Sequence, residues 1–183
     1  MGSWIAGGIG VLALLYIVWS YNRLVKLRMR VRNGWSQIDV QLRRRHDLIP
    51  NLVESVRGYM THEREVIDSI TRARQQAITA GSNLQERVVA ENTLSRSLRS
   101  LVVQTEAIPQ LRASETMLSL QEELSSTENR IAFARQHYND SVMEYNTAIT
   151  TVPNNLIAGP CGFSPEILFV ADETSREPAV VRF

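Results

Sequence analysis

The chain has 183 residues, and its 20 basic and 19 acidic side chains leave a formal net charge of +1. This balance gives no argument for a nucleic acid or an acidic substrate as a partner. Neither a nucleic acid nor a small-molecule substrate is expected. Cys161 is the single cysteine, which excludes an internal disulfide framework and fits a reducing compartment.

The N-terminal segment is strongly apolar. Trp4 to Tyr21 reads WIAGGIGVLALLYIVWSY, and no charged side chain precedes Arg23. A helix needs about 20 apolar residues to cross the hydrocarbon of a bilayer. A cleaved signal peptide is disfavoured because no basic residue precedes the apolar run and no small-residue cleavage site follows it. We therefore expect residues 1–22 to be a single transmembrane anchor.

Side chains at both ends of this segment predict where it meets the lipid surface. Aromatic rings favour the membrane interface, and basic residues next to a span favour the cytoplasmic side. The N-terminus is therefore expected outside and the rest of the chain in the cytoplasm. The expected interface residues are Trp4, Trp19, Tyr21, Arg23, Lys26, Arg28 and Arg30. Small residues four apart, Gly2, Ala6 and Gly10, would also let two spans approach closely.

A helical pattern continues beyond the span. Apolar residues recur every three or four positions, so one helix is expected to leave the bilayer and continue; they are Leu24, Leu27, Val31, Trp35, Ile38 and Leu42. In HDLIPN, either Asp47 caps a new helix with Pro50 in its first turn, or Pro50 bends a longer helix. The sequence leaves both alternatives open.

Three further helical stretches follow. The first runs from Leu52 to Ala80 and ends at a Gly81-Ser82-Asn83 turn. The second covers about residues 84–107 and ends before Pro109. The third begins after a Ser114 cap, continues to Thr150 and would be about 55 Å long at 1.5 Å per residue. The prediction is an all-α protein in which residues 23–151 form an elongated antiparallel bundle of three or four long, coiled-coil-like helices.

The remaining residues, 152–183, change in character. PNNLIAGPCGFSP places three prolines and two glycines around Leu156, Ile157 and Phe163. These apolar side chains either contact lipid or close one end of the bundle. The tail ADETSREPAVVRF, residues 171–183, is expected to be loosely held.

No spacing predicts catalysis or a cofactor. Helical metal sites use Glu-x-x-His pairs, but Arg43, Tyr59 and Ala134 stand three residues before the three histidines. His62-Glu63 lacks the second histidine of a zinc-protease motif. The chain has no nucleophile elbow and no phosphate-binding glycine loop. No enzymatic activity, metal or cofactor is therefore predicted.

Two polar regions, residues 41–59 and 121–146, interrupt the apolar periodicity. Either their charged groups pair across helices or between subunits and fix register, or they form a solvated face whose ion pairs contribute little. The candidate contact residues are Arg43, Arg44, Arg45, His46, Asp47, Pro50, Arg57, Glu123, Glu128, Arg130, Arg135, Tyr138, Asp140 and Glu144.

The same two regions resemble signatures of the LemA family of bacterial membrane proteins. RRRHDLIPNLVESVRGYMTHE resembles the first, LQEELSSTENRIAFARQHYNDSVMEYNTAI resembles the second, and VPNNLIAGPCGF extends the match. The resemblance implies a long antiparallel helical domain on one N-terminal anchor in the bacterial cytoplasmic (inner) membrane. The family has no established enzymatic activity.

These observations favour a homo-oligomeric scaffold that organises or remodels the membrane, with the lipid bilayer and further copies of the chain as partners. The alternative is an adaptor that recruits another membrane protein, such as a protease or transporter, through its helical faces. The third hypothesis is an enzyme, but the sequence contains no catalytic motif that supports it.

Overall fold

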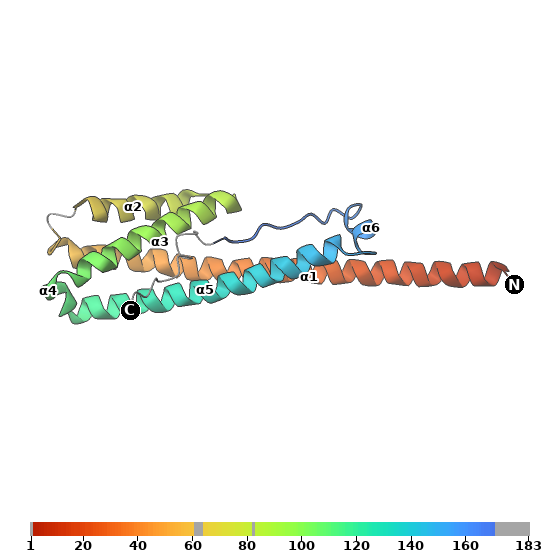
Figure 1. The fold of residues 1–183 in the computed structure, drawn as a ribbon, viewed down its shortest axis with the longest axis horizontal. Coiled ribbons are helices and arrows are strands. Elements are labelled where there is room, and N and C mark those ends of the chain that lie inside the picture. The colour runs from red at the N-terminus through yellow and green to blue at the C-terminus, as the bar shows by residue number, and fades with distance from the viewer. Residues whose placement is uncertain (1, 61–63, 82, 171–183) are drawn as a thin grey trace, which may run out of the picture. The chain divides into compact units, whose positions relative to one another are not determined.

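The computed structural model describes residues 2–60, 64–81 and 83–170 (Figure 1). The predicted loose tail, residues 171–183, lies outside these ranges. All regular structure in the described residues is α-helical, which confirms the predicted all-α class.

Six α-helices follow one another in the described part of the chain. They are α1 (Gly2–Arg57), α2 (Arg64–Thr79), α3 (Leu84–Glu106), α4 (Pro109–Arg112), α5 (Glu115–Thr150) and α6 (Asn155–Ala158). As predicted, Ser114 caps α5, because its Oγ accepts a hydrogen bond from the Met117 backbone N at 3.4 Å.

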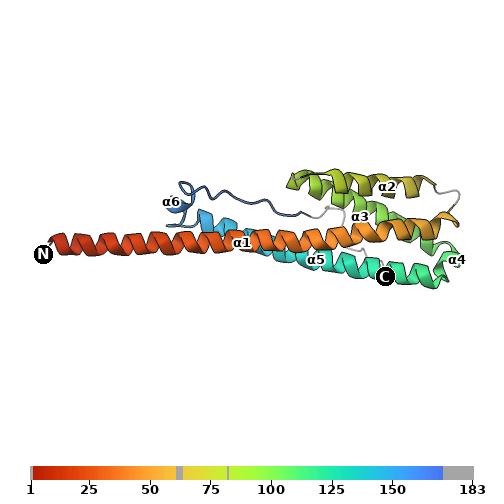
Figure 2. The same ribbon diagram turned by 180° about the vertical axis from the view of Figure 1, so that it is seen from behind.

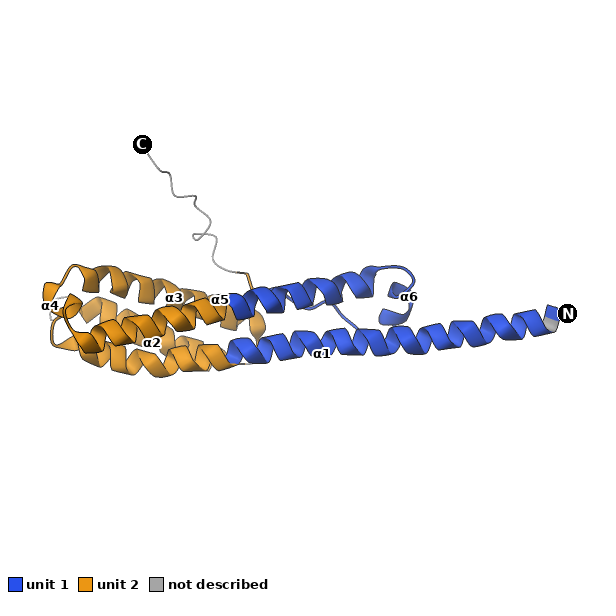
Figure 3. Cartoon of the chain, turned by 90° about the horizontal axis from the view of Figure 1, so that it is seen from below, with its two compact units in different colours: residues 1–39, 133–168 blue, residues 40–132, 169–183 orange. Residues whose placement is uncertain are grey.

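The chain divides into two compact units, each built from segments far apart in sequence (Figure 3). Unit 1 contains residues 1–39 and 133–168, and unit 2 contains residues 40–132 and 169–183. Helices α1 and α5 each contribute to both units.

In unit 1, the first part of α1 and the last part of α5 lie side by side and antiparallel (Figures 1 and 2). The predicted apolar stripes form the contact, with Leu24, Leu27, Val31 and Ile38 buried from α1 and Tyr138, Val142, Tyr145 and Ile149 buried from α5. The helices approach closely at Gly34, where a Cβ atom would lie 3.2 Å from the Cα of Tyr138. A larger residue there would require the facing backbone of Tyr138 to move by a few tenths of an ångström.

In unit 2, residues 40–57 of α1 pack with α2, α3, α4 and the first half of α5. Gly81, at φ +65°, turns the chain between α2 and α3, and the Asn83 side chain caps α3. The core contains Ile49, Leu52, Val56, Ile70, Leu94, Leu98, Leu101, Leu111, Met117 and Leu124.

For the region around Pro50 the sequence left two alternatives open, a new helix capped by Asp47 or a bend in one longer helix. Asp47 does not start a new helix, because α1 runs through Pro50 to Arg57. The chain instead leaves the helix at Gly58 and Tyr59, and α2 begins at Arg64. The predicted helical stretch from Leu52 to Ala80 is therefore wrong as one continuous helix. The spacing of Val56 and Tyr59 fits a helix even though the chain turns at this point.

Candidate functional site

A cluster of buried charges joins three helices of unit 2. Arg45 of α1 is 1% exposed. Its Nη1 donates to Ser95 Oγ at 2.7 Å and to Glu128 Oε1 at 2.8 Å, while its Nη2 donates to the Glu91 carboxylate. The His46 Nε2 lies 3.0 Å from the other Glu91 oxygen. These five residues, the buried ion cluster, connect α1 with α3 and α5.

The cluster keeps Glu91 ionised although the side chain is buried. Burial raises the pKa of Glu91, but the hydrogen bond from His46 and the positive charge of Arg45 lower it, and the net pKa is below the ordinary value of 4.5. A buried arginine balanced by carboxylates is strongly sensitive to the loss of one partner. The arrangement therefore links α1, α3 and α5 through paired charges.

Pro50 creates an attachment point beside this cluster. Proline has no backbone N–H, so in a helix it cannot donate to the carbonyl four residues earlier, which here belongs to His46. The Arg74 Nε of α2 donates to that carbonyl oxygen at 2.8 Å. The proline inside α1 thus frees an acceptor that α2 uses to dock.

The predicted contact residues are brought together only in part. The cross-helix pair between Arg45 and Glu128 is present, whereas Arg57 pairs with Glu54 of its own helix at 3.4 Å. Arg135 is half-buried, and the exposed members of the set are Arg43, Arg44, Asp47, Glu123, Arg130 and Asp140.

Glu91 lies at the centre of the cluster and was not predicted from the sequence. Glu91 stands on the buried stripe of α3 between Val88 and Leu94. A charged residue at a position where the helical period requires an apolar one was the sign that could have identified it. In the described residues, no group of three or more His, Cys, Asp or Glu side chains is arranged to hold a metal ion.

A segment after α6 is held along α5 in unit 1. We call residues 164–168 the C-terminal strap. The Tyr145 hydroxyl donates to the Ser164 carbonyl at 3.0 Å, and the Tyr138 hydroxyl donates to the Ile167 carbonyl at 2.8 Å. Asn146 exchanges two bonds of 2.9 Å with the Glu166 backbone. Burial, together with the negative charge of Glu166, raises the pKa of Tyr138 to about 12, so its phenol remains a donor.

The predicted membrane segment leaves its apolar side chains uncovered. Among the described residues, α1 alone is long and apolar enough to cross a membrane. Trp4 is 87% exposed and Leu12 is 67% exposed. Of the predicted interface residues beyond Trp4, Arg28 is half-buried and the others are exposed, namely Trp19, Tyr21, Arg23, Lys26 and Arg30.

The loop around α6 is fastened to the end of that apolar run. Asn154, which is buried, accepts hydrogen bonds through Oδ1 from the Tyr16 hydroxyl at 3.0 Å and from Ser20 Oγ at 2.8 Å. The rings of Phe163 and Tyr21 lie 5.6 Å apart, edge to face. Phe163 is therefore packed inside the unit, while Ile157 is half-buried and Leu156 is exposed.

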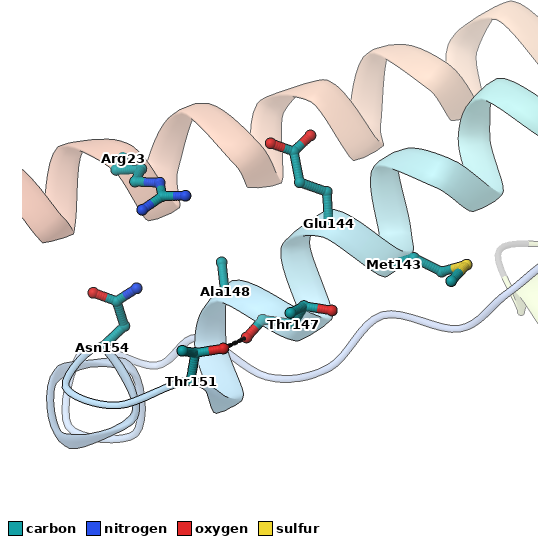
Figure 4. Close-up of a pocket in the computed structure, with 7 residues that line it drawn as sticks. All are labelled: Arg23, Met143, Glu144, Thr147, Ala148, Thr151 and Asn154. Atoms are coloured by element: carbon teal, nitrogen blue, oxygen red, sulfur yellow. Dashed lines mark hydrogen bonds between the residues drawn. The ribbon is translucent and has the colours of Figure 1, made fainter.

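A pocket of about 300 Å³ opens beside this loop (Figure 4). Arg23 reaches into it from α1, and Glu144 faces α1 from α5. The other lining residues are Met143, Thr147, Ala148, Thr151 and Asn154. Arg30 forms an exposed ion pair with Glu144 at 3.3 Å. The pocket is thus bounded by opposite charges and by the small side chains of α5.

These features define an all-α protein with one apolar N-terminal helix, a buried ion cluster and a loop fastened to the apolar segment. The model of the LemA family matches residues 34–183. The chain therefore belongs to the LemA family.

Individual relatives agree with this assignment. Protein LemA of Metamycoplasma hominis is 26% identical over 168 residues, covering 92% of this chain and 76% of the relative. Magnetosome protein MamQ of Magnetospirillum gryphiswaldense is 23% identical, covering 78% of this chain and 62% of its own length. Magnetosome protein MamQ 2 of Paramagnetospirillum magneticum is also 23% identical, covering 87% of this chain and 68% of the relative.

Proposed function

We propose that this protein is a non-enzymatic scaffold, anchored in the bacterial cytoplasmic membrane by the first part of α1, which self-assembles and organises the bilayer around it. The N-terminus faces outward and the helical domain lies in the cytoplasm. The observation that carries the proposal is the exposed apolar surface of residues 4–15, which no other part of the described chain covers. An exposed surface of this kind favours a lipid environment.

The α6 loop supports a second contact with the membrane. Asn154 is bonded to Tyr16 and Ser20, both of which lie within the last turns of the apolar run. A loop fastened at that level stands at the boundary of headgroups and acyl chains, where the exposed Leu156 side chain can enter the lipid. Insertion from one side would spread the headgroups of a single leaflet, which supports a membrane-organising role.

Self-assembly is supported by the surface of the span. A Cβ atom at Gly7 or Gly10 would meet nothing within 4 Å. Small residues on an exposed membrane helix allow two copies to approach closely. The names of the MamQ relatives place those proteins in magnetosomes, which is compatible with a role in organising a membrane.

The anchor is tested by placing a charge in the apolar run. Leu12→Arg is expected to move the protein from the membrane fraction to the soluble fraction, because an arginine at the centre of a span costs roughly 2.5–3.5 kcal/mol on insertion scales. Val40→Arg is the matched control, because Val40 is an exposed apolar residue outside the span. Membrane retention of Leu12→Arg equal to that of the control would exclude the anchor.

The scaffold is tested by reconstituting the full chain into liposomes and imaging them. Oligomers and altered vesicle shape are expected, and Gly10→Leu is expected to reduce both. Gly8→Leu, which changes the opposite face of the same helix, is the control, because a Cβ at Gly8 also meets nothing within 4 Å. Monomers in unaltered vesicles would refute the scaffold, and recovery of one stable heterologous membrane protein after cross-linking would favour the adaptor function instead.

A further inference from the structure

We propose that the pocket between α1, α5 and the α6 loop binds the headgroup of an amine-bearing phospholipid. Arg23 and Asn154 hold the phosphate, and Glu144 receives the primary amine. The inference rests on the proposed anchor, because the anchor brings lipid to the pocket, and it adds a ligand class and a site to that function.

The position of the pocket along α1 favours a lipid. Asn154, which forms one wall, is bonded to Tyr16 and Ser20 inside the apolar run. Arg23 follows Tyr21 by two residues, which is about 3 Å along a helix. A span that buries Trp4 to Tyr21 in hydrocarbon therefore places this pocket among the headgroups.

Two donors in the pocket suit a phosphate. The guanidinium of Arg23 lies over the Trp19 ring at 5.6 Å from its centroid, an arrangement that orients a cation. A planar guanidinium can donate two parallel hydrogen bonds to a phosphate. The Asn154 side chain accepts the hydrogen bonds from Tyr16 and Ser20 through Oδ1, and its amide nitrogen points toward the pocket (Figure 4). Arg23 and Asn154 can thus bind the same phosphate group.

Glu144 gives the pocket a preference among headgroups. Its carboxylate faces α1 across the pocket from Arg23 (Figure 4). The ion pair of Glu144 with Arg30 is exposed on both sides and is readily exchanged. A purely anionic headgroup would place negative charge near this carboxylate. A headgroup that carries both a phosphate and a primary amine matches the donors Arg23 and Asn154 on one side of the pocket and the Glu144 carboxylate on the other. The pocket volume of about 300 Å³ accommodates such a headgroup.

The test uses the full chain in nanodiscs of phosphatidylcholine with equal minor fractions of phosphatidylethanolamine and phosphatidylglycerol, and it measures the lipids retained by native mass spectrometry. Phosphatidylethanolamine is expected to be enriched severalfold over both other lipids. Arg23→Gln is expected to abolish the enrichment, and Arg23→Lys, which keeps the charge but not the planar fork, is expected to retain part of it. Lys26→Gln is the matched control, because Lys26 is exposed and does not line the pocket.

A second pair of variants tests the amine contact. Glu144→Gln is expected to remove the preference over phosphatidylglycerol, whereas Arg30→Gln breaks the same ion pair and should preserve that preference. Equal enrichment of the two lipids in the wild type would overturn the role of Glu144. Displacement of the lipid by equimolar inorganic phosphate would assign the pocket to free phosphate and overturn the lipid ligand.

Failure of this inference is distinguishable from failure of the anchor. A protein that inserts into nanodiscs but shows no lipid enrichment refutes the pocket and leaves the anchor intact. A protein that does not insert refutes the anchor itself, and with it the basis of the inference.

Discussion

Arg45 and Glu91 show how two charged residues can occupy positions that the helical pattern reserves for apolar ones. Both are about 1% exposed, and each is the other's partner. Such a pair contributes little net stability compared with apolar residues of similar size, but it discriminates strongly against misaligned helices, which would leave one charge unpaired. We therefore interpret the buried ion cluster as a determinant of helix register.

Removing one partner should be costly. Glu91→Ala is expected to lower the free energy of unfolding by roughly 3–5 kcal/mol, because it leaves the Arg45 charge buried with only Glu128 as an acidic partner. Glu106→Ala on the same helix, where the side chain is exposed, should change stability by less than about 0.5 kcal/mol. Urea unfolding of the full chain in detergent, followed by circular dichroism, measures the stability of both variants. Equal losses of stability would contradict the structural role of the buried ion cluster.

The lowered pKa of Glu91 predicts a pH dependence. A carboxyl whose folded pKa lies below its unfolded value contributes stability that is complete above the unfolded value and is lost as the pH falls through the folded one. Stability should therefore decline below about pH 4.5, the ordinary value for this group. In Glu91→Gln this part of the decline should be absent, although the other charged neighbours, Arg45, His46 and Glu128, remain. If the stability of the wild type and of Glu91→Gln declined equally as the pH falls, the assignment of this decline to Glu91 would be contradicted.

At the scale of elements, Pro50 explains how α2 is attached to α1. The carbonyl that the proline leaves without a helical donor is bound by Arg74. Arg74→Gln should destabilise the wild type by about 1–3 kcal/mol, because it removes a charged donor from a half-buried acceptor. In the Pro50→Ala background the same change should cost less, since the new backbone N–H then bonds the His46 carbonyl. A double-mutant cycle measures the coupling, and additive effects would refute it.

The C-terminal strap is held mainly by side chains of α5. Asn146→Ala removes two of the four hydrogen bonds described for this strap. Amide exchange in residues 164–168 should become faster, while exchange in α5 itself should stay slow. Asn129→Ala, an exposed asparagine on the same helix, is the control for hydrogen-exchange mass spectrometry. Unchanged protection of the strap would show that other contacts hold it.

The apolar stripes of α1 and α5 could be predicted from the sequence because each is a local repeat. Leu24, Val31 and Leu42 occupy buried positions as their spacing required. The turn at Gly58 could not be predicted, because the periodicity continues through it. The acceptor freed by Pro50 could not be paired with Arg74 either, because its donor comes from another helix and only the tertiary structure brings the two together.

At the scale of the whole molecule, the sites could not be predicted from the sequence either, because they depend on contacts between distant segments. The buried ion cluster, the strap and the α6 pocket each combine residues that are far apart in the chain, such as Arg45 with Glu91 or Tyr16 with Asn154. The types of residue were visible in the sequence, and Arg45 and Glu128 were both among the candidate contact residues, but the pair between them was not singled out. Which arginine meets which acid depends on helix register, which a single sequence does not contain.

The orientation of the whole chain can be tested with its own cysteine. Cys161 is exposed and is the single cysteine in the sequence. If the basic residues after the span keep the helical domain in the cytoplasm, a membrane-impermeant maleimide should label Cys161 only after the inner membrane is permeabilised. Cys161→Ser gives the background. Labelling at full rate in spheroplasts with intact membranes would place the domain on the other side.

The bonds from Tyr16 and Ser20 to Asn154 also determine where α1 can tolerate a change in length. Inserting one residue into a helix rotates everything beyond it by about 100°. Between Tyr16 and Leu24 such an insertion would turn one or both hydroxyl groups away from Asn154, because it rotates them relative to the buried stripe that begins at Leu24. Between Ile5 and Leu15, where the side chains are exposed, an extra residue would lengthen the segment without breaking a contact between α1 and the α6 loop. Adaptation to bilayers of different thickness is therefore expected in the first half of the span, with the second half kept constant in length.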